Sequence, residues 1–286
     1  MGYGYYSTAA YHEIRATKGY AHKSRAQIFA ARSIDPEMDP RTVVTRESRD
    51  SAEHPNSVPI IVGLDVTGSM GFVPEQIVKH GLPTLMDTII DGGIVDPQVL
   101  FCGVGDFVYD SAPLQVGQFE SSAELLDRWL TKVYLEGGGG GNNNESYNLA
   151  YLMAARHTST DAWEKRQEKG FLFTIGDEPC ASVIPGEVIE RLTTGANRQP
   201  VSTKEVLAEA QALYNTYHIH VVHDPSSMTE RRKEGWFELL GPNFIVLENY
   251  EDVSRTIASV VTGEVARRAA TLPRPTLSAA DTEVML

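Results

Sequence analysis

The sequence predicts an α/β fold, in which helices cover both faces of a doubly wound, mostly parallel central sheet of the Rossmann-like kind. Short apolar strands alternate with helical segments from about Val58 onward, and this alternation is typical of a parallel sheet with right-handed connections. Glycines and polar residues follow several of the strands, where ligands bind in such sheets. At 286 residues and 42% hydrophobic content, the chain has room for one main domain of roughly 200 residues with extensions.

Each predicted strand is a short apolar run. The strands cover residues 59–64, 99–104, 113–119 (an antiparallel strand at the sheet edge), 170–179, 217–223 and 243–248. Helical periodicity predicts helices over 74–90, 123–133, the segment from the glycine loop to about 156, 204–214, 230–240 and 252–266. Gly81 and Pro83 should kink the first of these helices without ending it, because its apolar face continues past them.

Both ends of the chain lack this alternation. Residues 1–57 are predicted to form an N-terminal arm and linker, with a short helix near 24–31, and residues 267–286 a flexible tail that contains two prolines. The main domain is thus predicted over residues 58–266. The tyrosines of the arm either bind a partner or pack against their own domain, and the sequence leaves both alternatives open.

The charge argues against nucleic acid as a partner. The formal net charge is −13, and an acidic surface repels a phosphate backbone. Two cysteines, Cys102 and Cys180, are too few for a disulfide framework. No apolar run reaches the roughly 20 residues that a membrane helix needs, and Tyr6 interrupts the myristoylation pattern. We therefore expect a cytoplasmic protein that binds neither nucleic acid nor membrane.

A candidate metal site follows the first strand of the main domain, in the sequence "PIIVGLDVTGSMG" (59–71). Asp65, Thr67 and Ser69 alternate along the chain, so their side chains can converge on one point. Hard oxygen ligands without His or Cys suit Mg²⁺, with Mn²⁺ as a possible substitute. Gly68 and Gly71 allow a tight turn around an ion.

Two further segments carry oxygen ligands beside glycines. The loop "GGGGGNNNES" offers Asn142, Asn143, Asn144 and Glu145, and the strand "FLFTIGDEP" ends in Asp177 and Glu178. Three such segments at strand or loop ends indicate a single site.

Together, these motifs resemble a von Willebrand factor A (vWA) domain with its metal-ion-dependent adhesion site. The resemblance covers roughly 58–266 and is strongest to intracellular bacterial and phage members and to the vWA domains of alpha-kinase-like proteins. It implies that Asp65, Thr67, Ser69, Asn142 and Asp177 hold the ion. The chain departs from the family pattern in having Thr67, a run of Asn in the second loop, and Gly-Asp-Glu in the third.

The family's function, transferred by this resemblance, is non-enzymatic binding of another protein. A metal ion would capture an acidic side chain of the partner, plausibly a MoxR-type AAA+ ATPase or another component of an intracellular assembly. The oligomeric state is not predicted.

Other interpretations compete with this one. The chain could be a structural or virion component with a vestigial metal site, or, less favourably, a serine hydrolase that uses Ser69 with His223 and Asp224, although T-G-S-M-G lacks the nucleophile-elbow spacing. Three histidines (His218, His220 and His223) fit zinc poorly, because no further ligand stands at suitable spacing. Asp106 is either a rim acid of the site or a turn residue, and Cys180 is expected to be buried rather than nucleophilic.

Overall fold

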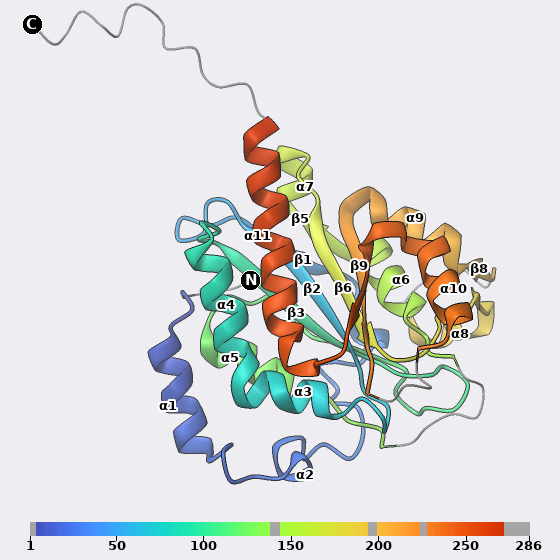
Figure 1. Ribbon diagram of the computed structural model, residues 1–286, viewed down its shortest axis with the longest axis horizontal. Coiled ribbons are helices and arrows are strands. Elements are labelled where there is room, and N and C mark those ends of the chain that lie inside the picture. The colour runs from blue at the N-terminus through green and yellow to red at the C-terminus, as the bar shows by residue number, and fades with distance from the viewer. Residues whose placement is uncertain (1–3, 138–143, 194–198, 224–227, 272–286) are drawn as a thin grey trace, which may run out of the picture.

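A six-stranded sheet forms the centre of the computed structural model, which describes residues 4–137, 144–193, 199–223 and 228–271 (Figure 1). Its strand order is β10-β9-β6-β2-β3-β4, and all neighbours are parallel except β3 and β4. The strands are β2 (Val58–Asp65), β3 (Pro97–Val104), β4 (Leu114–Val116), β6 (Gly170–Gly176), β9 (Tyr214–Val221) and β10 (Phe244–Leu247). The predicted α/β class with one antiparallel edge strand is confirmed.

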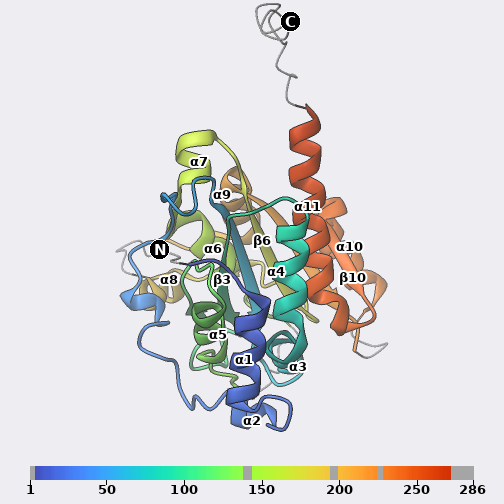
Figure 2. The same cartoon turned by 90° about the vertical axis from the view of Figure 1, so that its left-hand side faces the viewer.

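Helices cover both faces of this sheet (Figures 1 and 2). One face carries α1 (Thr8–Lys18), α3 (Phe72–Gln76), α4 (Leu82–Asp91), α5 (Ala123–Thr131) and α11 (Val253–Thr271). The other carries α6 (Asn148–Arg156), α8 (Gly186–Leu192), α9 (Thr203–Leu213) and α10 (Glu230–Leu240). Successive β2 residues therefore enter different cores: Ile60 and Val62 pack on one side, and Ile61 on the other.

The helix after β2 bends without ending, as its glycine and proline predict. Between α3 and α4 the backbone forms one π-helical segment, Ile77–Gly81, and continues directly into α4. An added Cβ at Gly81 would lie 2.4 Å from Ser254 Oγ of α11, so the missing side chain allows these two helices to approach closely.

The N-terminal arm packs against the domain. Tyr11 and Tyr20 are buried in the same core as α4 and α5; Tyr11 donates a hydrogen bond to the Val78 carbonyl (2.7 Å), and Tyr20 donates to Asp127 (2.9 Å). Of the two alternatives for the arm tyrosines, the structure thus shows packing for these two. The arm contains α1, which the periodicity did not predict, and α2 (Arg25–Ile28), which lies within the predicted short helix.

Smaller elements surround this framework. Two short pairs flank the main sheet: β1 (Arg46–Ser48) with β5 (Thr158–Thr160), and β7 (Val183–Ile184) with β8 (Val201–Ser202). The remaining helical segments are α7 (Asp161–Arg166) and the 3₁₀ turns Pro40–Thr42, Gly241–Asn243 and Tyr250–Asp252. Helix α11 extends to Thr271, five residues beyond its predicted end. No helix in the described ranges is long and apolar enough to cross a membrane.

Candidate functional site

The strand register brings two of the predicted ligand residues to the same end of the sheet. Strands β2 and β6 are adjacent and parallel, with Leu64 opposite Ile175. Asp65 ends β2, and Asp177 directly follows the last residue of β6. Both side chains are almost fully buried, with 1% and 3% of the residue surface exposed. The carboxyl end of the sheet therefore holds two neighbouring carboxylates, at the position where such folds bind ligands.

Asp65 is held by neutral donors. Its Oδ1 accepts hydrogen bonds from the Thr67 amide (2.9 Å) and the Thr67 hydroxyl (2.6 Å), and its Oδ2 accepts one from the Tyr147 hydroxyl (2.7 Å). Tyr147 reaches it across Gly176, where an added Cβ would lie 1.8 Å from the Tyr147 hydroxyl. The acid and the first hydroxyl of the first loop are thus in direct contact.

Asp177 contacts the other hydroxyl of the first loop. Ser69 donates to its Oδ1 at 3.5 Å, the long limit of a hydrogen bond, and His223 Nδ1 lies 3.3 Å from its Oδ2. Arg232 of α10 donates to the Asp177 carbonyl (3.2 Å) and pairs with the Glu178 carboxylate (2.7 Å). Ser69 is exposed to solvent, so the site is open on the side of its hydroxyl.

Glu145 is a further acid near these two. It lies just before α6, is 5% exposed, and is fixed by backbone hydrogen bonds to Pro179 and Ala181 in the segment after β6. Its buried Oε2 has no hydrogen-bond partner among the described residues. Burial, followed by the charge of Asp65 and other acids, raises the pKa of Glu145. The sequence offered residues 142–145, of which the family resemblance selected Asn142, and the structure buries Glu145.

The carboxyls of the two strand ends also have raised pKa values. Burial raises the pKa of Asp65 to about 7, with a further contribution from the charge of Asp177, against the lowering effect of the Thr67 and Tyr147 hydrogen bonds. Burial likewise raises the pKa of Asp177, although His223 and Ser69 oppose the shift. Negative charge at this end is therefore poorly compensated by the protein's own groups.

The donor set fits a hard divalent cation. Two buried carboxylates (Asp65 and Asp177) and two hydroxyls (Thr67 and Ser69) are oxygen ligands of the kind that Mg²⁺ prefers. No group of three or more His, Cys, Asp or Glu side chains that could hold a metal occurs in the part of the chain that the structure describes. The predicted set contains only two acids and relies on hydroxyl and amide oxygens, so the metal site stays a prediction.

The structure places the other predicted residues as follows. Asn142 lies outside the described residues. Asp106 is 2% exposed, and its Oδ1 accepts from the Val108 amide (2.9 Å), as expected of a turn acid. Tyr147 was not predicted: no local pattern marks a tyrosine that reaches a strand end 82 residues earlier.

His218 and Cys180 of this region have packing roles. His218 stacks on Trp236 with ring centroids 3.6 Å apart and contacts the Thr174 hydroxyl at 2.9 Å. Burial lowers the pKa of His218, which favours the neutral imidazole. Burial also raises the pKa of the Cys180 thiol to about 12, so this thiol is not an activated nucleophile.

The contacts of Ser69 do not have the order of a hydrolytic triad. In such a triad the imidazole lies between the hydroxyl and the carboxylate. Here Asp177 lies between Ser69 and His223, and its carboxylate contacts both. Asp224, the acid named for the hydrolase interpretation, lies outside the described residues; among the described residues, the contacts of Ser69 give this interpretation no support.

Comparisons with known proteins give distant structural likenesses. No family model matches the chain, and no curated protein matches its sequence. The open conformation of the pilus adhesin SpaC from Lactobacillus rhamnosus GG aligns with 77% of this chain at 10% sequence identity and a TM-score of 0.49. Another crystal structure of SpaC aligns with 77% of this chain at 9% sequence identity and a TM-score of 0.46. Proximal thread matrix protein 1 from the mussel byssus aligns with 72% of this chain at 11% sequence identity and a TM-score of 0.48. The chain spans about a third of the adhesin (31% and 32%) and about half of the mussel protein (47%).

Proposed function

We propose that this chain is a non-enzymatic, vWA-type protein-binding module, which captures an acidic side chain of a partner through Mg²⁺ or Mn²⁺. One observation carries the proposal: Asp65 and Asp177 are buried together at adjacent strand ends. The described residues that hydrogen-bond the Asp65 carboxylate are neutral. Two such carboxylates are destabilising when both are ionised, and a cation shared between them would relieve the repulsion.

The residues of the site would have two different roles in binding the ion. Asp65, Thr67, Ser69 and Asp177 would supply the oxygen ligands, and Tyr147 orients the Asp65 carboxylate from behind. When bound, the ion supplies a Lewis-acidic position for the carboxylate of another protein. Because Ser69 is exposed whereas both acids are buried, the partner would approach from the side of Ser69.

The partner and the compartment belong to the same proposal. We retain a MoxR-type AAA+ ATPase or another component of a cytoplasmic assembly, on the strength of the family resemblance alone. Both cysteines are free thiols, as expected in a reducing compartment.

Calorimetric titration of the purified chain with MgCl₂ and MnCl₂ tests the metal site. We expect saturable binding to the wild type, and loss of binding in Asp65→Ala, with folding checked by circular dichroism. Asp91→Ala, which removes an exposed acid at the end of α4, should bind like the wild type. Equal binding by all three proteins would refute the site. No binding to the wild type would favour the structural component with a vestigial site.

A further inference from the structure

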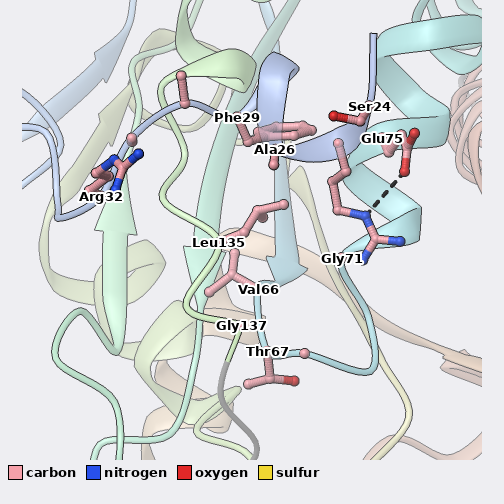
Figure 3. A pocket seen from close by; sticks show the side chains of 14 residues that line it. Ser24, Ala26, Phe29, Arg32, Val66, Thr67, Gly71, Glu75, Leu135 and Gly137 are labelled. Atoms are coloured by element: carbon pink, nitrogen blue, oxygen red, sulfur yellow. Dashed lines mark hydrogen bonds and ion pairs between the residues drawn. The ribbon is translucent and has the colours of Figure 1, made fainter.

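A cavity of about 770 Å³ lies between the N-terminal arm and the first metal-binding loop (Figure 3). The arm lines it with residues 24–26 and 29–32, and the loop lines it with Val66, Thr67, Gly68 and Gly71. Thr67 is also one of the predicted metal ligands. A chain whose carboxylate binds at the metal site would therefore have this cavity, which we call the arm pocket, close by on the Thr67 side.

The arm is a fixed wall of this pocket. Ile28 and Phe29 are 7% and 5% exposed and belong to the main core. Arg25 Nε lies 3.1 Å from a carboxylate oxygen of Glu75 in α3. An added Cβ at Gly71 would lie 2.7 Å from Arg25 Nη1, so the guanidinium rests directly on the metal-binding loop. The pocket is thus part of the folded domain.

The chemistry of the pocket is apolar with a basic rim. Phe29, Val66 and Leu135 contribute apolar side chains, which Figure 3 shows between Arg32 and Glu75. Arg32 is exposed and makes no hydrogen bond or ion pair with the described residues. The Arg25 side chain is 41% exposed, and its one carboxylate partner among the described residues is Glu75. In a chain of net charge −13, two guanidiniums at one pocket favour an acidic ligand.

We propose that the arm pocket is a subsite for the partner's peptide segment, which extends the function proposed above and rests on it. The segment carries one acid at the metal, an aliphatic side chain in the apolar part of the pocket and a second acid on Arg32. Successive residues of an extended peptide are about 3.3 Å apart, so residues close in sequence to the first acid reach the pocket that Thr67 also lines. The partner is thereby specified as a protein with an exposed acidic–aliphatic–acidic segment.

The test measures side-chain preference around a fixed aspartate. Immobilised heptapeptides with a central aspartate and varied flanking residues are probed with the folded full chain in Mg²⁺, and the best peptide is then titrated by fluorescence anisotropy. We expect selection of an aliphatic residue and a second acid on one side of the aspartate. Arg32→Ala should weaken this peptide about tenfold, the loss of one charge-assisted contact, and Arg32→Glu should weaken it further. Neither change should alter Mg²⁺ binding.

Arg156→Ala is the matched control, because Arg156 is a part-exposed arginine of α6, on the other face of the sheet, that pairs with Glu209. It should leave peptide affinity unchanged. The subsite would be overturned if the flanking residues had no effect on binding, if Arg32→Ala bound the peptide as tightly as the wild type, or if no peptide bound at all. The Mg²⁺ titration tests the metal site separately. Selective binding that depends on Arg32 but persists in EDTA and in Asp65→Ala would support the pocket and overturn metal-dependent capture.

Discussion

Acids with little solvent exposure lie at both ends of the central sheet, but the protein pairs them with its own basic residues more completely at one end than at the other. At the amino end, Asp50 accepts from the Ser57 amide and hydroxyl and pairs with Arg166 (2.7 Å). Asp161, at the start of α7, pairs with Arg49 (3.0 Å) and Lys165 (2.7 Å). The acids at this end are thus bound by basic residues of the protein itself.

At the carboxyl end, hydroxyls take the place of most basic partners. Asp65 is hydrogen-bonded by Thr67 and Tyr147, and one buried oxygen of Glu145 has no hydrogen-bond partner in the part of the chain that the structure describes. The pKa values differ accordingly: those of Asp50 and Asp161 are lowered, and those of Asp65 and Glu145 are raised. The comparison teaches that the acids at the amino end are paired within the fold, whereas Asp65 and Glu145 at the carboxyl end have no basic partner among the described residues, which is where the proposed cation would act.

The largest expected effect is at the amino end. Arg166→Ala should lower the free energy of unfolding by about 2–3 kcal/mol, because it removes the main partner of a carboxylate that is 12% exposed. Urea denaturation measures this loss, which should be the same in Mg²⁺ and in EDTA. A loss below about 0.5 kcal/mol would show that Asp50 does not depend on its basic partner.

Removing a charged side chain at the carboxyl end should have the opposite effect on stability. In EDTA, we expect Asp177→Asn to raise the free energy of unfolding by about 1–2 kcal/mol, since an acid with a raised pKa is destabilising when ionised at neutral pH. The same variant should lose the stabilisation that Mg²⁺ gives the wild type. Asp91→Asn, at an exposed position, serves as the control; destabilisation by Asp177→Asn in EDTA would contradict the comparison.

A smaller effect is expected from the residue that orients Asp65. Tyr147→Phe removes the 2.7 Å hydrogen bond and leaves the aromatic ring in place. We expect Mg²⁺ affinity to fall about tenfold, or about 1.4 kcal/mol, as for other groups that support a metal ligand from behind. Calorimetry measures the change. An unaltered affinity would mean that Thr67 alone fixes the carboxylate.

The smallest effect concerns pH. Burial alone would raise the pKa of Asp161, but hydrogen bonds from Lys165, the Asp50 amide and Arg49 outweigh it and lower the pKa to about 2. A lowered pKa contributes stability above the unfolded value near 4, and this contribution is lost as the pH falls from about 4 to about 2. After allowance for solvent screening we expect about 1 kcal/mol. Denaturation of the wild type and Asp161→Asn across this range should show it, with Glu13→Gln, an exposed acid of α1, as control.

The sequence predicted the sheet well because each strand is a compact apolar run with glycine or proline nearby. Helix α10 begins and ends at its predicted residues, whereas α5 stops at Thr131, two residues early, and Tyr214 starts β9 instead of ending α9. Helix α1 was missed because it buries only one residue, Tyr11, which leaves no apolar stripe. Its caps, Ser7 and the left-handed Gly19, were the available signs.

The site was only partly predictable. Spacing identified Asp65, Thr67 and Ser69, since alternation along one loop is a local property. Tyr147 and Glu145 join them through contacts across the fold, and no local pattern records such contacts. The arm pocket depends likewise on residues about 40 positions from the loop that they face.

Gly176 affects which amino-acid substitutions this protein tolerates. It supplies no ligand atom, yet any side chain there would occupy the space of the Tyr147 hydroxyl. In a library of all single substitutions, we expect substitutions of Gly176 to reduce function as strongly as substitutions of Asp65. A second substitution that replaces Tyr147 with a smaller residue should partly restore function. Gly176 would then be selected as strongly as the site residues, although it contacts neither ion nor partner, because the space beside it holds the Tyr147 hydroxyl.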